Sequence, residues 1–422
     1  MNPIRVTEYE WIPISSLGGL EGHLAKIESG LPKGTITWGF NAISFGRYCG
    51  VIQVDGLTIE VLPKTSSART ADEERIIFLR MLELALDIRL YSTGDAMLGW
   101  SDFTLLDLFI LRFCDELQRC LVAGMHRQYI RHEDNLTMIR GKVMVAANVR
   151  ANIHRADHVF CAFDELSDNT LLNRVIRTTL GYLYALAKSD RARRNTNELL
   201  SRFDQVDAWV CNLHQLDAIQ LDRNASRFEG ILEQCRWFLR GLSPDVFSGE
   251  HTNIALLFSM PKLFEEVVAR EIRTHLAPQG YQVRAQGPIR AFVGPQDDPA
   301  RTPFSMKPDI TVFNDGIVKC VMDTKWKVLE AGSDLGISQS DLYQIATYGS
   351  EYDAAFGNDQ DTPPVALVYP VARNTDVGTL HRWQIRGQKR PLFIVTVPIG
   401  LLASGVGRFR TELRKIVDQV LG

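Results

Sequence analysis

Two short acidic motifs on either side of a turn constrain this chain more than any other part of its sequence. The segment 307–325 reads K-P-D-I-T-V-F-N-D-G-I-V-K-C-V-M-D-T-K, and Asp323 follows Asp309 by fourteen residues. Two apolar runs flank the Asn-Asp-Gly turn, which predicts a β-hairpin. Asp309 opens the first strand, whereas Asp323 and Lys325 lie two residues apart on the second and therefore share a face. Two carboxylates and an ammonium group at one sheet edge suit a divalent cation and an attacking water, which phosphodiester hydrolysis requires.

Length and composition are those of an ordinary globular protein. The 422 residues suffice for two or three domains, and the 45% hydrophobic and 23% charged residues are usual values. No apolar run approaches the roughly 20 residues that span a bilayer, and the first residues lack a signal-peptide pattern, so we expect no membrane contact and a cytoplasmic protein. The seven cysteines contain no C-x-x-C pair, which argues against a disulfide framework or a zinc site. With a net charge of −3, any contact with nucleic acid must come from local basic patches.

The order of predicted elements divides the chain into three parts. Residues 1–100 are predicted to be a β-rich domain, with a strand at 35–40, a hairpin at 50–62 around the turn Asp55-Gly56, and a helix at 72–88. Residues 101–245 are predicted to be mainly helical, with a mixed segment that contains a short strand near 140–144 and with helices at 101–128, 169–187, 195–215 and 223–242.

Residues 246–422 show a different order of elements. The sequence predicts helices at 261–275, 338–351 and 406–421, strands at 281–285, 289–293, 365–369 and 392–397, and the hairpin at 308–326. We therefore expect an α+β, or mixed α/β, chain whose last part is a mixed sheet flanked by helices.

The helix before the hairpin supplies a third carboxylate. Its apolar stripe is formed by Leu263, Phe264, Val267 and Val268, and Glu265 and Glu266 are the candidates. One helix and two strands can thus bring Glu265 to Asp309, Asp323 and Lys325. Mg²⁺ prefers oxygen ligands and keeps several waters, so we expect Asp309 and Asp323 to be metal ligands. Lys325 would orient the attacking water or stabilise charge in the transition state.

The pattern P-D-x13-D-x-K resembles the PD-(D/E)XK nuclease superfamily. A solvated hairpin with surface charges is the alternative, but Val321 and Met322 indicate a buried strand, where an unpartnered Asp or Lys is costly. Gln344 and Tyr348 follow on one face of a predicted helix, as in RecB-like members of that superfamily. The resemblance implies that Gln344 supports the site or meets the DNA backbone. The alternatives are a surface polar residue for Gln344 and a core aromatic for Tyr348.

Further segments resemble the McrC family, and they follow one another in the order expected for it. They are G-V-I-Q-V-D-G-L-T-I-E-V-L-P-K at 50–64, R-G-K-V at 140–143, F-D-E-L-S-D-N-T at 163–170 with L-N-R at 172–174, L-F-E at 263–265, and V-M-D-T-K-W-K at 321–327. The family provides the nuclease subunit of the McrBC modification-dependent restriction system. The resemblance implies an AAA+ GTPase partner, McrB, which recognises modified cytosine in double-stranded DNA and translocates it. It also implies that the N-terminal part docks on the partner ring and stimulates GTP hydrolysis.

The sequence contains no G-x-x-x-x-G-K-[ST] motif, so we expect no nucleotide site in this chain. If NTP hydrolysis drives the system, another subunit must supply it.

Basic residues crowd the connection between the last two predicted strands. We expect Arg386, Lys389 and Arg390 to contact DNA phosphate near the cut site, and the alternative is a solvated loop. A role in trans at the partner's nucleotide site is open for Arg140, Lys142, Arg47 and Lys64, and the sequence does not choose among them.

The leading hypothesis is therefore a Mg²⁺-dependent DNA endonuclease subunit with Asp309, Asp323 and Lys325 at its centre and Glu265 and Gln344 in support. The second is a non-catalytic adaptor that activates an AAA+ ring and retains a vestigial nuclease fold. A nuclease that cuts without a partner is the third.

Overall fold

The computed structural model of the chain describes residues 3–19, 21–28, 31–54, 57–65, 70–86, 103–209, 212–223, 225–241, 253–293, 304–329, 334–357, 362–371, 378–388 and 390–422. Helices and sheets with both parallel and antiparallel neighbours confirm the predicted α+β, or mixed α/β, class. None of the described helices combines the length and the apolar composition that a membrane crossing needs.

The chain divides into two compact units. Unit 1 consists of Met1–Gly50, Ile59–Ser101 and Leu257–Gly422, and unit 2 of Val51–Thr58 and Asp102–Leu256. The division of the sequence into three parts at residues 100 and 245 stays a prediction.

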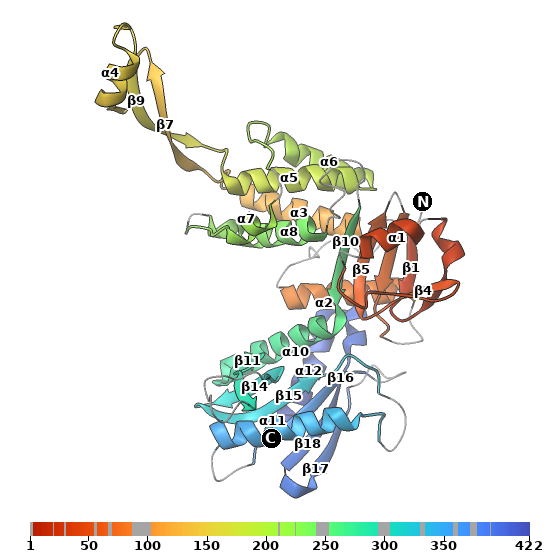
Figure 1. Ribbon diagram of the computed structural model, residues 1–422. Helices are drawn as coiled ribbons and strands as arrows, with labels where there is room; N and C mark the ends of the chain where they lie inside the picture. Colours follow the sequence, from red (N-terminus) through yellow and green to blue (C-terminus); the bar gives the residue numbers. More distant parts are fainter. Residues whose placement is uncertain are drawn as a thin grey trace. The chain divides into compact units, whose positions relative to one another are not determined.

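Helices make up most of unit 2 (Figure 1). Their bounds are Leu105–Leu121 for α3, Leu171–Leu186 for α5, Asp190–Ser201 for α6, Leu213–Ala218 for α7 and Glu229–Gly241 for α8, with a 3-10 turn, η3, at Ser226–Phe228. The hydroxyl of Thr104 accepts a hydrogen bond from the backbone N–H of Asp107 and so caps α3. The predicted cap residues Ser101 and Asp102 lie outside the described residues. The single helix predicted at 195–215 is wrong, because α6 ends at Ser201 and Asn212 caps a new helix, α7.

A long antiparallel hairpin is the second component of unit 2. Strand β7 (Gln128–Leu136) pairs with β9 (Val159–Ser167), from Gln128 opposite Ser167 to Leu136 opposite Val159. The predicted short strand is present as β8 (Lys142–Val143), which also pairs with β9, and helix α4 (Val145–Ala151) follows it. We call residues 128–167 the arm; Figure 1 shows it leading away from α5, with α4 at its far end.

The N-terminal residues of unit 1 contribute short strands. β1 (Ile4–Thr7) lies parallel to β6 (Leu57–Leu62), with Ile4 opposite Ile59, in a sheet of order β1-β6-β5-β10. The other two strands of this sheet are β5 (Tyr48–Val54) and β10 (Ile254–Ser259), and β5, β6 and β10 each contain residues of both units. The remaining N-terminal elements are a sheet of β2 (Trp11–Pro13), β4 (Ala42–Phe45) and β3 (Ile36–Trp38), helices α1 (Glu21–Glu28) and α2 (Ala71–Leu86), and a 3-10 turn, η1 (Ile14–Leu17). The predicted turn Asp55-Gly56 lies outside the described residues.

The C-terminal residues of unit 1 form a six-stranded mixed sheet of order β11-β14-β15-β16-β18-β17. β14 and β15 are antiparallel, β15, β16 and β18 are parallel, and β17 is antiparallel to β18. The strands are β11 (Gln282–Ala285), β14 (Ile310–Asn314), β15 (Ile317–Thr324), β16 (Val365–Pro370), β17 (Leu380–Ile385) and β18 (Arg390–Val397). β12 (Arg290–Val293) and β13 (Phe304–Met306) pair separately. The sequence did not predict β17, which occupies part of the expected basic connection.

The turn between β14 and β15 has the predicted chemistry. Asp315 and Gly316 have φ values of 51° and 79°, so both central residues are left-handed, as a type I′ turn requires. Asn314 therefore lies opposite Ile317, and the register brings Ile310 opposite Met322.

Helices lie against this sheet (Figure 1). They are α10 (Met260–Leu276), α11 (Gln339–Phe356) and α12 (Val406–Leu421), with 3-10 turns η4 (Ala277–Gln279), η5 (Arg386–Gln388) and η6 (Ile399–Ala403). Ile345 and Tyr352 of α11 share a buried core with Val321 and Leu367 of the sheet. Because alternate strand residues face the same side, Asp323 lies on the α11 side, two residues after Val321.

Candidate active site

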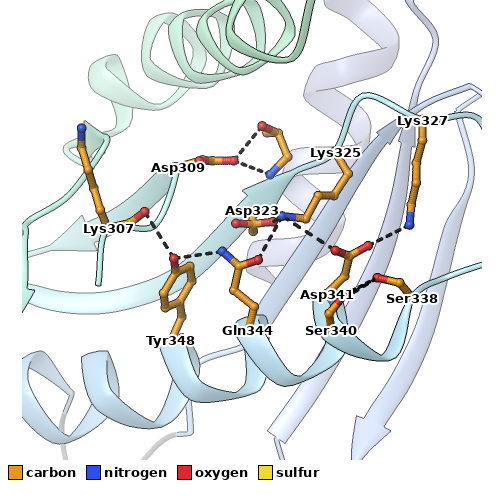
Figure 2. Close-up of polar contacts among 11 residues, drawn as sticks. Lys307, Asp309, Asp323, Lys325, Lys327, Ser338, Ser340, Asp341, Gln344 and Tyr348 are labelled. Carbon is orange, nitrogen blue, oxygen red and sulfur yellow. Dashed lines mark hydrogen bonds and ion pairs between the residues drawn. The ribbon is translucent and has the colours of Figure 1, made fainter. Parts of the chain in front are cut away.

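Asp309 lies directly before β14 and reaches across to the end of β15. Its Oδ2 accepts hydrogen bonds from the backbone N–H of Thr324 at 2.7 Å and from the Thr324 hydroxyl at 2.8 Å (Figure 2). Two donors from one residue fix the direction of the carboxylate. Both bonds end on Oδ2, so Oδ1 is the oxygen that they leave for another ligand.

Asp323 and Lys325 form the centre of the site. Asp323 is 2% exposed, and its Oδ2 lies 2.5 Å from Lys325 Nζ. The same ammonium donates to Gln344 Oε1 at 3.1 Å (Figure 2). The structure thus brings together Asp323, Lys325 and Gln344, three residues that the sequence predicted for the site.

The electrostatics of the site reflect crowding of negative charge. Burial, reinforced by the charge of Asp309, raises the pKa of Asp323 to about 6. Burial, again with Asp309, raises the pKa of Glu265 to about 7. Burial opposes the charge of Lys325, but the surrounding carboxylates outweigh this effect and raise its pKa. Lys325 is therefore the cation that Asp323, Asp341 and Asp309 share.

Gln286 connects Glu265 to the hairpin, and the sequence did not indicate this role. Its side-chain amide donates to Glu265 Oε1, its side-chain oxygen accepts from Lys307 Nζ, and its backbone N–H donates to the carbonyl of Asp309 at 2.7 Å. Gln286 has a φ of 53°, a left-handed conformation uncommon for residues other than glycine. A single glutamine between two strands carries no motif, so only the folded structure reveals this link.

Helix α11 supports the site from the other side. Gln344 Nε2 donates to the Tyr348 hydroxyl at 3.0 Å, and that hydroxyl donates to the carbonyl of Lys307 at 3.5 Å (Figure 2). Asp341 accepts from Lys327 Nζ at 2.8 Å and lies 3.9 Å from Lys325 Nζ. Asp341 precedes Gln344 by three residues on the same helix face, which is a sequence signal that could have indicated it.

The carboxylates of the site fit a magnesium ion that keeps much of its water shell. Among the residues that the structure describes, no three His, Cys, Asp or Glu side chains form a complete ligand group. Mg²⁺ is nevertheless commonly held by one or two carboxylates with waters and substrate phosphate. Burial raises the pKa of both Asp323 and Glu265, and the charge of Asp309 adds to each rise, so a divalent cation beside Asp309 would relieve its repulsion with both carboxylates.

Comparison with known proteins gives the chain a family. Residues 43–370 match the family model described as "McrBC 5-methylcytosine restriction system component". The chain belongs to the McrBC family. None of the curated proteins matches this McrBC-family chain.

Two solved structures resemble it in fold. One is the refined half-complex from a tetradecameric assembly of Thermococcus gammatolerans McrB AAA+ hexamers with bound McrC, with a TM-score of 0.72 and 18% identity over 99% of this chain and 100% of that chain. The other is the cryo-EM structure of the Thermococcus gammatolerans McrBC complex, with a TM-score of 0.54 and 20% identity over 65% of this chain and 88% of that chain. At these identities the similarity shows the fold.

The basic residues predicted to meet DNA have different surroundings in this McrBC-family chain. Arg386 is exposed in η5, and Lys389 lies outside the described residues. Arg390 is 3% exposed, and its guanidinium donates to Asp353 Oδ2 at 2.9 Å and to the carbonyl of Pro363. These contacts hold Arg390 inside the protein and give it a structural role. A DNA contact by Arg386 stays a prediction.

The four candidates for a role in trans lie in different units. Arg140 and Lys142 belong to the arm, where Arg140 lies 4.1 Å from the ring centre of Phe163 and 3.6 Å from Glu165. Arg47 and Lys64 belong to unit 1 and are exposed. The structure does not select one of them.

Proposed function

We propose that this McrBC-family chain is the DNA-cleaving subunit of a modification-dependent restriction complex, with a PD-(D/E)XK nuclease domain that hydrolyses phosphodiesters with Mg²⁺. The observation that carries the proposal is the convergence of Asp309, Asp323 and Lys325 at one edge of the sheet, with Gln344 bonded to the lysine. A buried carboxylate beside an ammonium is costly in a fold that does not use it.

Each side chain has a separate task in this mechanism. Asp309 and Asp323 would hold Mg²⁺, which when bound polarises the scissile phosphate and makes a bound water more acidic. Lys325 presents its ammonium to the water or to the negative charge of the transition state, and Gln344 fixes its direction. Glu265, whose pKa is about 7, can take up a proton near neutral pH.

The partner in this proposal is an AAA+ GTPase ring whose GTP hydrolysis the chain stimulates. The family match and the fold shared with a structure of McrB AAA+ hexamers with bound McrC support it. The sequence has no P-loop of its own, so the nucleotide would bind to the partner. The substrate would be double-stranded DNA that carries a modified cytosine, in line with the description of the family.

The arm offers a surface for that partner in addition to the N-terminal residues. Large apolar side chains are unusually exposed on it, namely Tyr129, Met138, Ile139, Val145, Val149 and Ile153. Clustered exposed apolar side chains are typical of protein interfaces.

Substitution of Asp309 and Lys325 tests the function. Asp309→Ala and Lys325→Ala should each abolish cleavage of methylated DNA by the assembled complex with Mg²⁺ and GTP, while partner binding and GTP hydrolysis persist. Lys319→Ala is the matched control, because Lys319 lies on the same strand and should leave cleavage unchanged. Cleavage that survives both active-site substitutions would show that the site is misassigned and would favour the non-catalytic adaptor.

A further inference from the structure

Trp326 lies between two lysines that hold the candidate active site. The backbone N–H of Lys325 donates to the carbonyl of Val368 at 2.8 Å, and the N–H of Lys327 donates to the carbonyl of Lys325 at 3.0 Å, which makes a tight turn centred on Trp326. The side chains of the two lysines contact Asp323 and Asp341, respectively. A rotation of Trp326 would therefore change the direction of both lysines.

Two contacts fix the indole ring. Its Nε1–H donates to Glu8 Oε1 at 2.8 Å, and its ring centre lies 5.5 Å from that of Phe264. Phe264 directly precedes Glu265 on α10. The ring of Trp326 thus packs beside both elements that carry predicted catalytic groups, the Lys325 turn and the first turns of α10.

Glu8 belongs to the N-terminal residues and is bound firmly to them. Its backbone N–H donates to the carbonyl of Leu62 at 2.9 Å, and its Oε1 also accepts from the backbone N–H of Lys64 at 3.0 Å. The side chain is buried, with 1% of the residue exposed, and Oε2 has no hydrogen-bond partner. Leaving a buried carboxyl oxygen without a partner is unfavourable.

A second hydrogen bond joins the N-terminal residues to helix α10. The backbone N–H of Met260, the first residue of α10, donates to the carbonyl of Arg47 at 2.9 Å. The helix that carries Phe264 and Glu265 therefore begins on a residue of the N-terminal segment.

From these contacts we propose that Glu8 is a positioning residue of the nuclease site. It anchors Trp326 and thereby sets Lys325 and Glu265, so that the N-terminal segment 4–8 with 62–64 controls whether the site is assembled. This inference rests on the proposed function and adds its regulation: a protein that binds the N-terminal segment acts on DNA cleavage through the bond between Glu8 and Trp326.

Variants that separate the hydrogen bond from packing test this role. Glu8→Ala removes the acceptor, whereas Trp326→Phe removes the donor and keeps an aromatic ring on Phe264. Each should slow single-turnover cleavage of methylated plasmid DNA by the assembled complex by about tenfold or more, since small misplacements of catalytic groups have large effects on rate. The double variant should be no slower than the slower single variant, because both remove one bond. Glu8→Gln keeps an acceptor for the indole and should restore cleavage.

A control variant in unit 1 tests whether a loss of stability alone, without displacement of catalytic groups, slows cleavage. Arg410→Ala removes the ion pair in which Arg410 Nε lies 2.6 Å from Glu271 on α10, far from Trp326 in sequence. It should lower the melting temperature and leave the cleavage rate of the folded protein unchanged. An equal loss of cleavage in Arg410→Ala, or a failure of Glu8→Gln to restore it, would overturn the role of Glu8.

A crystal structure of Glu8→Ala provides a readout that does not depend on cleavage. We expect Trp326 to move and Lys325 Nζ to leave Asp323 Oδ2, from which it is 2.5 Å away in the native chain. An unchanged Lys325–Asp323 pair would refute the inference whatever the activity. The role of Glu8 can be tested separately from the proposed function. If Lys325→Ala abolishes cleavage and Glu8→Ala does not, only the role of Glu8 is refuted. Full cleavage by Lys325→Ala would refute the nuclease assignment itself.

Discussion

The hairpin of β14 and β15 and the arm of unit 2 are both antiparallel hairpins, but they depart from the usual pattern of burial in opposite ways. In the first, Asp323 is 2% exposed, although carboxylates are rarely buried. In the second, Met138 and Tyr129 are 76% and 74% exposed, although large apolar side chains usually lie inside. Each departure is unfavourable for an isolated folded chain, and the proposed function gives each hairpin something to bind.

Under the proposed function, the two hairpins serve different roles. Buried, paired charges suit chemistry on a phosphate, because a weakly hydrated site strengthens electrostatic interactions. Exposed apolar side chains suit a partner that removes them from water. We therefore expect substitutions in the two hairpins to produce defects that do not overlap.

The largest effect is expected when the charged pair of the first hairpin is neutralised as a whole. Asp323→Asn/Lys325→Met should abolish cleavage, because it removes a proposed metal ligand together with the ammonium. The folded chain should lose little stability, because removing both charges together leaves no uncompensated charge from this buried pair. Cleavage rates and chemical denaturation measure the two quantities. A strong loss of stability would mean that the pair is structural and that the contrast between the hairpins is mistaken.

The converse experiment changes the arm. Replacing Met138, Ile139 and Ile153 by serine should weaken binding to the AAA+ partner by about a hundredfold, since a few buried apolar anchors carry most of the affinity of an interface. The melting temperature should not fall, because these side chains are exposed in the free chain. Val122→Ser, at an 86% exposed position of the same unit outside the arm, is the control in a titration of the partner. Unchanged affinity in the triple variant would remove the arm from the interface.

Local sequence patterns predicted the first hairpin well and the arm poorly, for a physical reason. Asp315 and Gly316 specify a type I′ turn, and apolar runs on both sides set the register, so every signal lies within a short segment. The arm pairs Gln128 with Ser167 across many residues, and its mostly exposed strand β7 shows no apolar alternation. A strand without a buried face leaves little trace in its sequence.

The candidate site was predictable only where its residues follow one another on regular elements. Asp309, Asp323 and Lys325 come from one hairpin, and Gln344 from the next helix. Gln286 acts from a left-handed loop position, and Glu8 lies 318 residues before Trp326, to which it is bonded. Contacts between residues so far apart in the sequence form only in the tertiary structure. Arg390 is the opposite case, because a run of basic residues does not reveal which one is buried against a carboxylate.

The smallest predicted effect concerns pH and the carboxyl of Glu8. Like Asp323 in the first hairpin, this carboxyl is buried. Burial raises the pKa of Glu8 from 4.5 to about 7, although bonds from Lys64 and Trp326 oppose the shift and Glu74 adds to it. Because the folded state binds this proton more tightly than the unfolded state, the contribution of Glu8 to stability is fully present below pH 4.5 and is lost as pH rises to about 7.

Glu8→Gln cannot ionise, so the stability of this variant should lack the loss. Relative to the native chain, the variant should gain about 1–3 kcal/mol as pH rises from 4.5 to about 7. Urea denaturation of both proteins at several pH values measures the difference. Parallel stability curves would show that Glu8 keeps an ordinary pKa. Among the described residues, burial would then raise the carboxyl pKa of Asp323 in the hairpin and Glu265 in α10, where a cation is expected.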